Sequence, residues 1–310
     1  MNLKQLRYFI CIAKVGSLSK ASEVLSIAQP ALSQQLQKLE EELGVELLTR
    51  HSRGVMINDV GLMMQQHFTA ILREIDRTQD LVRDYTLNPA GEVTLGIPTT
   101  AARALTAPLL ARVHQKFPKI NMHVVEAMSG SLNDSLHLGL IDLTVLYNPR
   151  PPLGIGSTID YTPVLREDLF LISKNKEQIN NRKTIPFAML EDLPLVVPCS
   201  SNTLARLLYD EAEKSRIKLN VKFEIDSLSG IIELIDSNFF TILPKLGLYR
   251  ELEQERMVAT PITDPQLYWN VYVATAYKGI RSRAVRVVHR TLLDLMAEMV
   301  KNGEWKGELL

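Results

Sequence analysis

The chain has 310 residues, of which 46% are hydrophobic and 23% are charged. This length and composition suit two or more globular domains and exclude disordered and fibrous proteins. The 35 lysines and arginines balance the 35 aspartates and glutamates, so the formal net charge is zero. Any binding to nucleic acid must therefore depend on locally arranged charges, because affinity for duplex DNA comes largely from neutralising phosphates.

No segment has the composition of a membrane span or a secretion signal. Charges interrupt the apolar positions of the opening run MNLKQLRYFICIAKVG, and no stretch approaches the ~20 apolar residues of a transmembrane helix. The two cysteines, Cys11 and Cys199, lie far apart in the sequence, which favours neither a disulfide framework nor a thiolate metal site. We expect a cytoplasmic protein with no membrane partner, no bound metal and no cofactor.

The first forty residues predict two short helices and the start of a third. Apolar residues recur at helical spacing as far as Gly16, and glycine suits the left-handed conformation past a helix end. A second start signal follows at Ser17 or Ser19, and Pro30 falls where a helix tolerates proline, in its first turn. Short helices joined by a tight turn are typical of a helix-turn-helix.

The third predicted helix has an apolar inner stripe and a polar outer face. Serine and glutamine side chains near its N-terminal end can donate and accept hydrogen bonds at base edges in the major groove. Glu40, Glu41 and Glu42 at the other end would repel phosphates, so we expect the helix to enter the groove N-terminus first. The predicted DNA contacts on this helix are Gln29, Pro30, Ser33, Gln34, Gln37 and Lys38.

The following segment, VELLTRHSRGVMIND, predicts a two-stranded wing with a basic tip. Arg50 and Arg53 would reach phosphates or a minor groove from this tip. The alternative interpretation is that both are solvated surface arginines, but their position beside a helix-turn-helix favours a role in DNA binding.

A long helix is predicted from Asn58, a good N-cap, to about Tyr85. Its apolar residues are spaced alternately four and three apart, as in a coiled-coil seam. The seam could pack on its own domain, but a three-helix head is too small to cover a helix of roughly 40 Å, so we expect a partner chain to cover it. The predicted seam is Met64, Phe68, Ile71, Ile75, Thr78, Val82 and Tyr85.

The run GSLSKASEVLSIAQPALSQQLQKLEEELGVELLTRHSRGVMINDVG resembles the LysR-type transcriptional regulators, with the helix-turn-helix, wing and linker helix in the family's order. Departures are mild: Leu48, Asn58 and Val60 replace the family's usual phenylalanine, threonine and alanine. Within the family the chain is similar to the nitrogen assimilation control branch. The resemblance implies binding to double-stranded promoter DNA, dimers that join into a tetramer, and contact with RNA polymerase if the protein is an activator.

Beyond the linker, β-prone and helical segments alternate, which indicates an α/β fold. EVTLGI, NMHVVEA and LTVLY form a first unit, VLREDLFLI at 164–172 opens a second, and YWNVYVAT returns to the first. The segment from His137 to Asp142 is similar to the family's GxLD element, and the family's effector domain has two lobes, like a periplasmic binding protein, with the effector in the cleft between them.

The predicted fold is thus an N-terminal all-α winged helix-turn-helix, a long linker helix and a C-terminal α/β two-lobed effector domain that resembles periplasmic binding proteins. The proposed boundaries are 1–58 for the DNA-binding domain, 59–85 for the linker helix, 86–91 for a hinge and 92–310 for the effector domain, with lobe I at about 92–161 and 266–310 and lobe II at about 162–265.

Polar residues begin helices in both lobes, where free N–H groups and hydroxyls favour anions. A small carboxylate is therefore the predicted effector. The alternatives are that these residues are only N-caps and turn formers, or that no effector is needed. Ser237 and Phe239 replace two family glycines, which predicts an altered turn and a pocket narrowed by Phe239 or Phe240. The predicted effector residues are Thr99, Thr100, Ser129, Ser200, Ser201, Asn202 and Thr203.

Other classes of function find less support in the sequence. No GxSxG, Walker, GxGxxG or HExxH motif occurs, and the histidines lack metal-ligand spacing, so we expect no enzyme. A redox sensor would need two thiols able to meet. A solute-binding protein of the same two-lobed class is the main alternative, but it would need a secretion signal and would have no use for a helix-turn-helix.

Overall fold

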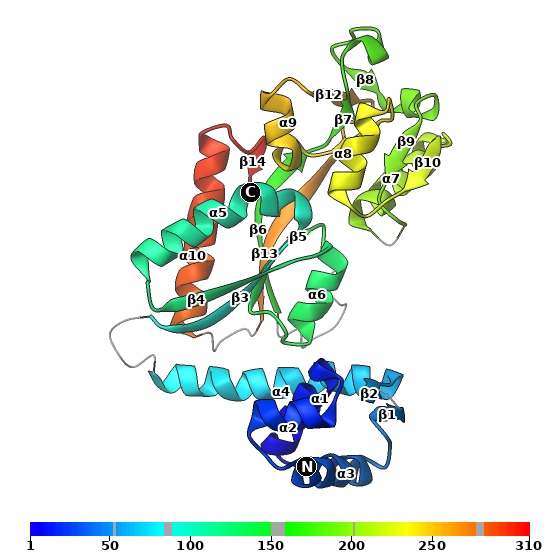
Figure 1. Ribbon diagram of the computed structural model, residues 1–310. Helices are drawn as coiled ribbons and strands as arrows, with labels where there is room; N and C mark the ends of the chain where they lie inside the picture. Colours follow the sequence, from blue (N-terminus) through cyan, green and yellow to red (C-terminus); the bar gives the residue numbers. More distant parts are fainter. Residues whose placement is uncertain (52–53, 84–88, 150–158, 201, 277–281) are drawn as a thin grey trace. The chain divides into compact units, whose positions relative to one another are not determined.

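The computed structural model describes residues 1–51, 54–83, 89–149, 159–200, 202–276 and 282–310 (Figure 1). The chain divides into two compact units, the first made of Met1–Tyr85 and Leu138–Leu140 and the second of Thr86–His137 and Ile141–Leu310. Among the described residues, no helix is both long and apolar enough to cross a membrane.

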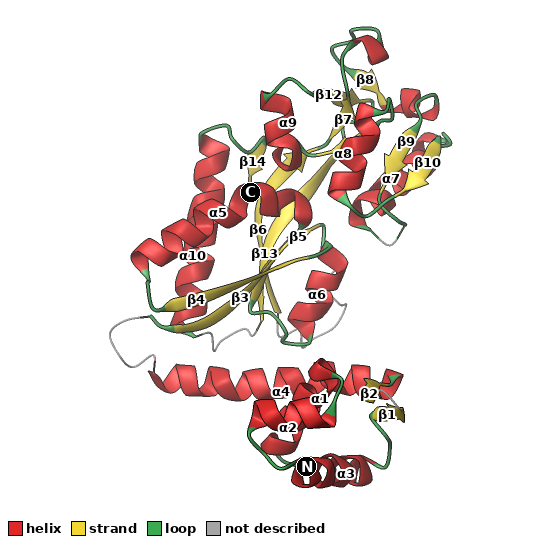
Figure 2. Cartoon of the chain, in the orientation of Figure 1, coloured by secondary structure: helices red, strands yellow, loops and turns green. Residues whose placement is uncertain are grey.

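The N-terminal unit is a head of three helices and a two-stranded sheet, continued by a long fourth helix (Figure 2). Gly16 (φ 69°) ends the first helix in the left-handed conformation. Ser17 caps the second by accepting a hydrogen bond from the Lys20 N–H, and Pro30 lies in the first turn of the third. The elements are α1 (Leu3–Val15), α2 (Leu18–Leu25), α3 (Gln29–Leu43), β1 (Leu48–His51), β2 (Gly54–Ile57) and α4 (Asp59–Arg83).

The core of the head includes Phe68 of α4, which corrects the interpretation that a partner chain covers the whole seam of this helix. Phe68 is 1% exposed, and its ring meets that of Phe9 edge to face with centroids 5.7 Å apart. Met64 and Leu72 pack against the same core. A small head cannot cover all of a long helix, but it covers one face of the first turns.

In the C-terminal unit, lobe I is a six-stranded sheet in the order β14-β6-β13-β5-β3-β4. Val145 and Tyr147 of β5 face the main core with α5 and α10, whereas Leu146 faces a smaller cluster with α6, so helices cover both faces (Figure 1). The elements are β3 (Gly91–Ile97), α5 (Thr99–Lys116), β4 (Ile120–Glu126), α6 (Ser129–His137), β5 (Leu143–Tyr147), β6 (Ile159–Asp168), β13 (Tyr268–Ala276), α10 (Arg283–Lys301) and β14 (Gly307–Leu309).

Lobe II contains a four-stranded sheet in the order β11-β7-β12-β8 and a parallel pair, β9 and β10. A bridge between Leu195 and Phe240 joins the two. The elements are β7 (Phe170–Ser173), η1 (Glu177–Ile179), β8 (Ile185–Pro186), η2 (Phe187–Glu191), β9 (Leu195–Val197), α7 (Thr203–Ser215), β10 (Val221–Glu224), α8 (Leu228–Asp236), β11 (Thr241–Leu243), η3 (Lys245–Leu248), α9 (Tyr249–Glu253) and β12 (Val258–Thr263).

The first crossover between the lobes lies later than the sequence predicts. Strand β6 continues to Asp168 and pairs with β13 and β14 in the sheet of lobe I, and only β7, after Leu169, pairs within lobe II. The run VLREDLFLI is continuously β-prone, so its pattern does not mark where it leaves one sheet for the other. Lobe I therefore extends to about residue 168 rather than 161.

Candidate functional site

The outer face of α3 presents the predicted polar side chains together. Gln29, Pro30, Gln34 and Lys38 are exposed, and Ser33 is half-buried on the flank. Three leucines on the opposite face are buried in the core of the head. The exposed side chains are thus free of packing constraints and lie along one side of a helix, as base-edge contacts from a recognition helix require.

The acidic end of α3 is tied to the wing. One oxygen of Glu40 accepts hydrogen bonds from the backbone N–H groups of Leu47 (2.8 Å) and Leu48 (3.3 Å). Glu41 accepts one from Nε2 of Gln37 at 2.8 Å, so Gln37 is exposed but already has a partner on its own helix. The sequence predicts only repulsion of phosphates here and misses that Glu40 fastens the recognition helix to β1.

The predicted wing is present as an antiparallel pair of strands, β1 and β2. The Val55 N–H donates to the Gly16 carbonyl oxygen at 3.1 Å, which joins β2 to the end of α1. Arg53 and the side chain of Arg50 lie outside the described residues, so their contact with DNA stays a prediction.

Asn58 joins the wing to α4. Its Oδ1 caps the helix by accepting from the Gly61 N–H at 2.7 Å, while its Nδ2 donates to the Glu46 carbonyl oxygen at 2.8 Å. A Cβ atom at Gly61 would collide with the Leu47 carbonyl oxygen. Glycine therefore permits the close approach of the helix to the wing.

The seam of α4 splits into a covered and an open part. Met64 is half-buried and Phe68 is buried by the head, whereas Ile71 is 40% exposed and Ile75 is half-buried. The side chains of Thr78 and Val82, and Tyr85 as a whole, lie outside the described residues. Ile71 is therefore the most exposed side chain in the described part of the seam.

A cavity that is partly open to solvent lies between the two lobes. Five of the predicted effector residues line it: Thr99, Thr100, Ser129, Asn202 and Thr203. Ser200 is exposed and is not among the lining residues, and Ser201 lies outside the described residues. The ends of β3 and β4 and the starts of α5, α6 and α7 thus meet at one hollow, as the sequence predicts.

Several of these polar groups already have partners. Thr100 Oγ1 and the Tyr147 hydroxyl are 2.8 Å apart, and Ser129 Oγ accepts from the Tyr147 N–H at 3.2 Å. Asn202 caps α7 through Oδ1 and donates from Nδ2 to Met128 Sδ across the cleft at 3.4 Å. Capping is therefore a role of Asn202, whereas Thr100 and Ser129 bond to Tyr147, and all three residues line the cavity.

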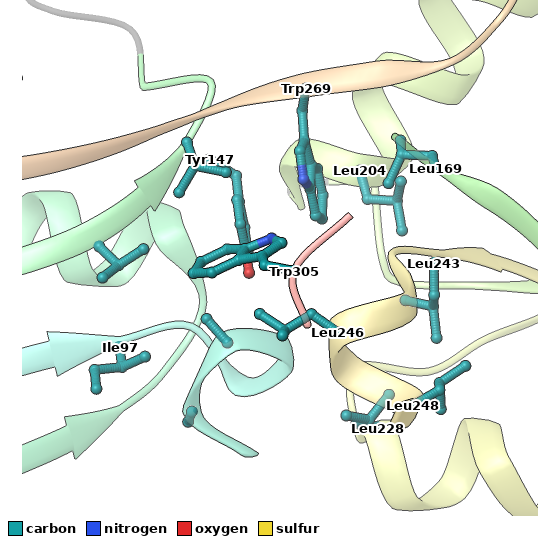
Figure 3. Packing of buried hydrophobic residues seen from close by; sticks show 14 of the residues in the cluster. Ile97, Tyr147, Leu169, Leu204, Leu228, Leu243, Leu246, Leu248, Trp269 and Trp305 are labelled. Carbon is teal, nitrogen blue, oxygen red and sulfur yellow. The ribbon is translucent and has the colours of Figure 1, made fainter. Parts of the chain in front are cut away.

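An aromatic and aliphatic wall completes the cavity and is missed by the sequence reasoning. Tyr147 ends β5 and stacks on Trp269 of β13, with ring centroids 4.0 Å apart and an angle of 9°. Burial, and then the nearby Glu167, raise the pKa of Tyr147 well above its ordinary value, so its hydroxyl stays neutral. The remaining apolar lining includes Ile231 and the side chains of Leu204, Leu228 and Leu243, which Figure 3 labels.

The charges around the cavity are few. Asp226 is the one charged side chain among the residues that line it, and one of its oxygens accepts from the Cys199 N–H at 3.0 Å. Arg206 lines the adjoining hollow together with Asn202 and Thr203, and its guanidinium donates to Thr203 Oγ1 at 3.3 Å. A cation therefore borders the adjoining hollow and is not among the residues that line the cavity itself.

The turn before β11 has its left-handed residue at Asn238, between Ser237 and Phe239. Asn238 has φ 70°, a conformation that asparagine tolerates better than most residues. Phe239 packs against Phe223 with ring centroids 5.2 Å apart, and Phe240 is buried. Neither phenylalanine lines the cavity, so the expectation that they narrow the pocket is wrong.

An ion pair holds the lobes together beside the cavity. Arg103 of α5 donates to the Gly247 carbonyl oxygen (2.6 Å) and to Glu251 Oε1 (2.7 Å) in lobe II. A Cβ atom at Gly247 would lie 3.0 Å from the Thr100 Cβ, so η3 packs closely on the start of α5. The lobes are therefore fastened together on the side of the cleft nearest α5.

The chain combines two parts: a helix-turn-helix with a wing and an exposed polar recognition helix, and a two-lobed domain with a cleft. This combination defines a ligand-responsive class of DNA-binding regulator. Residues 3–62 match the model for "Bacterial regulatory helix-turn-helix protein, lysR family" and residues 87–297 that for "LysR substrate binding domain". The chain belongs to the LysR family of DNA-binding transcriptional regulators.

Individual relatives agree with this assignment. The chain is 36% identical over 310 residues to the nitrogen assimilation regulatory protein nac of Escherichia coli, covering 99% of both chains. It is 31% identical to that of Klebsiella aerogenes, covering 96% of both. Among solved structures, a full-length OxyR variant from Pseudomonas aeruginosa (20% identity, TM-score 0.70, 95% of this chain and 94% of that one) and CbnR in complex with its target DNA (19%, 0.70, 94% and 99%) share the fold.

Proposed function

We propose that the protein is an oligomeric, non-enzymatic regulator of bacterial promoters, acting in the cytoplasm, whose effector is a small carboxylate bound in the interlobe cleft. One observation carries this proposal: the N-terminal ends of three helices, from both lobes, line one cavity, and Arg206 lines the hollow that adjoins it. Residues 1–58 would bind DNA, 59–85 pair chains, 86–91 act as a hinge and 92–310 bind the effector. RNA polymerase would be a partner if the protein activates transcription.

The DNA-binding part of the proposal rests on the exposed face of α3, and the CbnR structure contains target DNA bound to a protein of this fold. Gln34→Ala should remove a base contact, costing ~1–3 kcal/mol at its preferred site and relaxing base preference at one position. Lys38→Ala, on the same face, should weaken binding to all sequences. It should also reduce by ~1 the slope of the logarithm of the binding constant against the logarithm of the salt concentration. Electrophoretic mobility shifts on an operator and its point variants measure both. Equal losses on every sequence for Gln34→Ala would contradict its assignment.

The effector part predicts that threonine hydroxyls at the cleft bind the ligand. Thr100→Val and Thr203→Val keep the side-chain shape and should each weaken binding by ~1–2 kcal/mol per lost hydrogen bond. Calorimetry and thermal-shift screening against dicarboxylates, aromatic acids and amino acids give the measurement. Ser200→Ala, which is exposed and outside the cavity, is the matched control. If no such acid stabilises the wild type, the carboxylate proposal fails.

The assembly part predicts that α4 pairs two chains through Ile71 and Ile75, and the dimers would join into a tetramer through the effector domains. Ile71→Glu should dissociate the dimer, because pairing would bury an unpaired carboxylate. Light scattering of the full chain measures the mass, and Glu74→Gln on the same helix is the control. An unchanged mass for Ile71→Glu would restrict the role of α4 to its own head.

A further inference from the structure

The two tryptophans of the chain donate to one carboxylate. Trp269 Nε1 donates to Glu167 Oε2 and Trp305 Nε1 donates to Glu167 Oε1, each at 2.6 Å. Glu167 is 1% exposed, and no ion pair of this residue is found in the described part of the chain. The carboxylate oxygens are therefore satisfied by indole N–H groups instead of a cation, an arrangement that holds both rings in place.

The register of the sheet explains this arrangement. Glu167 of β6 lies directly opposite Trp269 of β13 and Gly307 of β14. Side chains at directly opposed positions share one face of a sheet, so Glu167 and Trp269 project together into the core. Trp305 precedes β14 and is also buried there, beside Tyr147 and Trp269 in the main core (Figure 3).

A chain of contacts leads from this carboxylate to the cleft. Trp269 stacks on Tyr147, and both rings line the cavity. The Tyr147 hydroxyl reaches Thr100 at the start of α5. A small shift of the Trp269 ring would therefore move the aromatic wall of the cavity and the threonine that borders it.

We propose that Glu167 is a positioning residue of the effector cleft and that its protonation state sets the aromatic wall formed by Trp269 and Tyr147. The ionised carboxylate accepts strongly from both indoles, whereas the neutral acid has one oxygen occupied by a proton and accepts more weakly. The proposal rests on the proposed function only for the role of the cleft. The coupling between Glu167 and the wall does not depend on any ligand.

The surroundings of Glu167 bring its ionisation into a pH range in which the folded protein can be studied. Burial raises the pKa of Glu167 to about 8, against the lowering effect of the two indole hydrogen bonds, and Asp168 on the same strand raises it further. Two strands away, on β5, the charge of Glu167 contributes to the raised pKa of Tyr147. From α10, the buried residues are apolar apart from Thr291.

Tryptophan fluorescence of the full chain tests the proposal without a ligand, because both indoles report on Glu167. Between about pH 6 and 10 the wild type should show one reversible transition with a midpoint near 8. Trp305→Phe should keep a transition that comes from Trp269 alone, and Glu167→Gln should abolish it. Glu298→Gln, an exposed carboxylate on α10, is the matched control and should titrate like the wild type.

Acrylamide quenching in the Trp305→Phe background tests the link to the cleft. The quenching constant of Trp269 should change across the transition, because its ring lines the cavity. Any one of three results would overturn the proposal: no transition in the wild type, a transition that persists in Glu167→Gln, or a quenching constant that does not change with pH. The wild-type titration decides the first point even if Glu167→Gln does not fold. Failure of the effector screen leaves all these readouts unaffected, so the two proposals fail separately.

Discussion

Phe68→Ala is expected to lower the free energy of unfolding of the head by ~3–5 kcal/mol, the usual cost of truncating a buried phenylalanine. Phe68 is 1% exposed and packs edge to face on Phe9. Its removal would leave a cavity between α1 and α4, at the point where the linker helix joins the core. Denaturant unfolding followed by circular dichroism measures the loss.

Ile71→Ala is the matched control, because Ile71 lies one turn further along the same helix and is 40% exposed. This substitution should cost the head less than ~1 kcal/mol while weakening the association of two chains. If Phe68→Ala instead preserved stability and changed only the oligomeric mass, Phe68 would belong to the interface between chains and its burial by the head would be wrong.

The stability of the C-terminal unit is expected to fall as the pH rises from about 5 to about 8, through the burial of Glu167. Its folded pKa of about 8 lies above the ordinary 4.5, so the folded state keeps a proton that the unfolded state releases. The stabilisation is fully present below the unfolded pKa and is lost as the pH rises through the folded one. The slope is at most about 1.4 kcal/mol per pH unit, the value for one proton.

Urea unfolding of the full chain at several pH values gives this slope. Tryptophan fluorescence follows the unfolding of the C-terminal unit, because both indoles lie in it. Glu167→Gln should flatten the dependence between pH 5 and 8, and Glu298→Gln should leave it unchanged. Parallel slopes for the wild type and Glu167→Gln would mean that another group carries the linkage.

The secondary structure of the head was largely predictable because its signals are local. Gly16 ends a helix through its own backbone conformation, and Ser17 and Asn58 cap helices through their own side chains. The residue type at each position is enough to indicate this role. The environment of Phe68 was not predictable in the same way. A spacing of four and three marks an apolar face but not what covers it, and here the head covers the first part and leaves Ile71 open.

The polar half of the cleft was predictable and the apolar half was not. Thr100 and Asn202 each stand where a strand ends and a helix begins, a local pattern that places each at the end of the sheet of its own lobe, and both line the cavity. Trp269 reaches the cavity only because β13 inserts between β5 and β6, and Glu167 meets Trp305 only through the pairing of β14. Such long-range pairings leave no trace in local periodicity.

The contacts of Asn58 and Gly61 connect the wing and the linker helix rigidly. Asn58 bonds both the helix, through the Gly61 N–H, and Glu46 in the segment that leads into β1, and Gly61 leaves no space for a side chain beside Leu47. Glu40 bonds the Leu47 and Leu48 N–H groups of the same segment and so couples it to α3. A tilt of the linker helix would therefore move the recognition helix with it. In the proposed dimer, a change in the angle between the two linker helices would alter the spacing of the two half-sites that the dimer can reach on DNA.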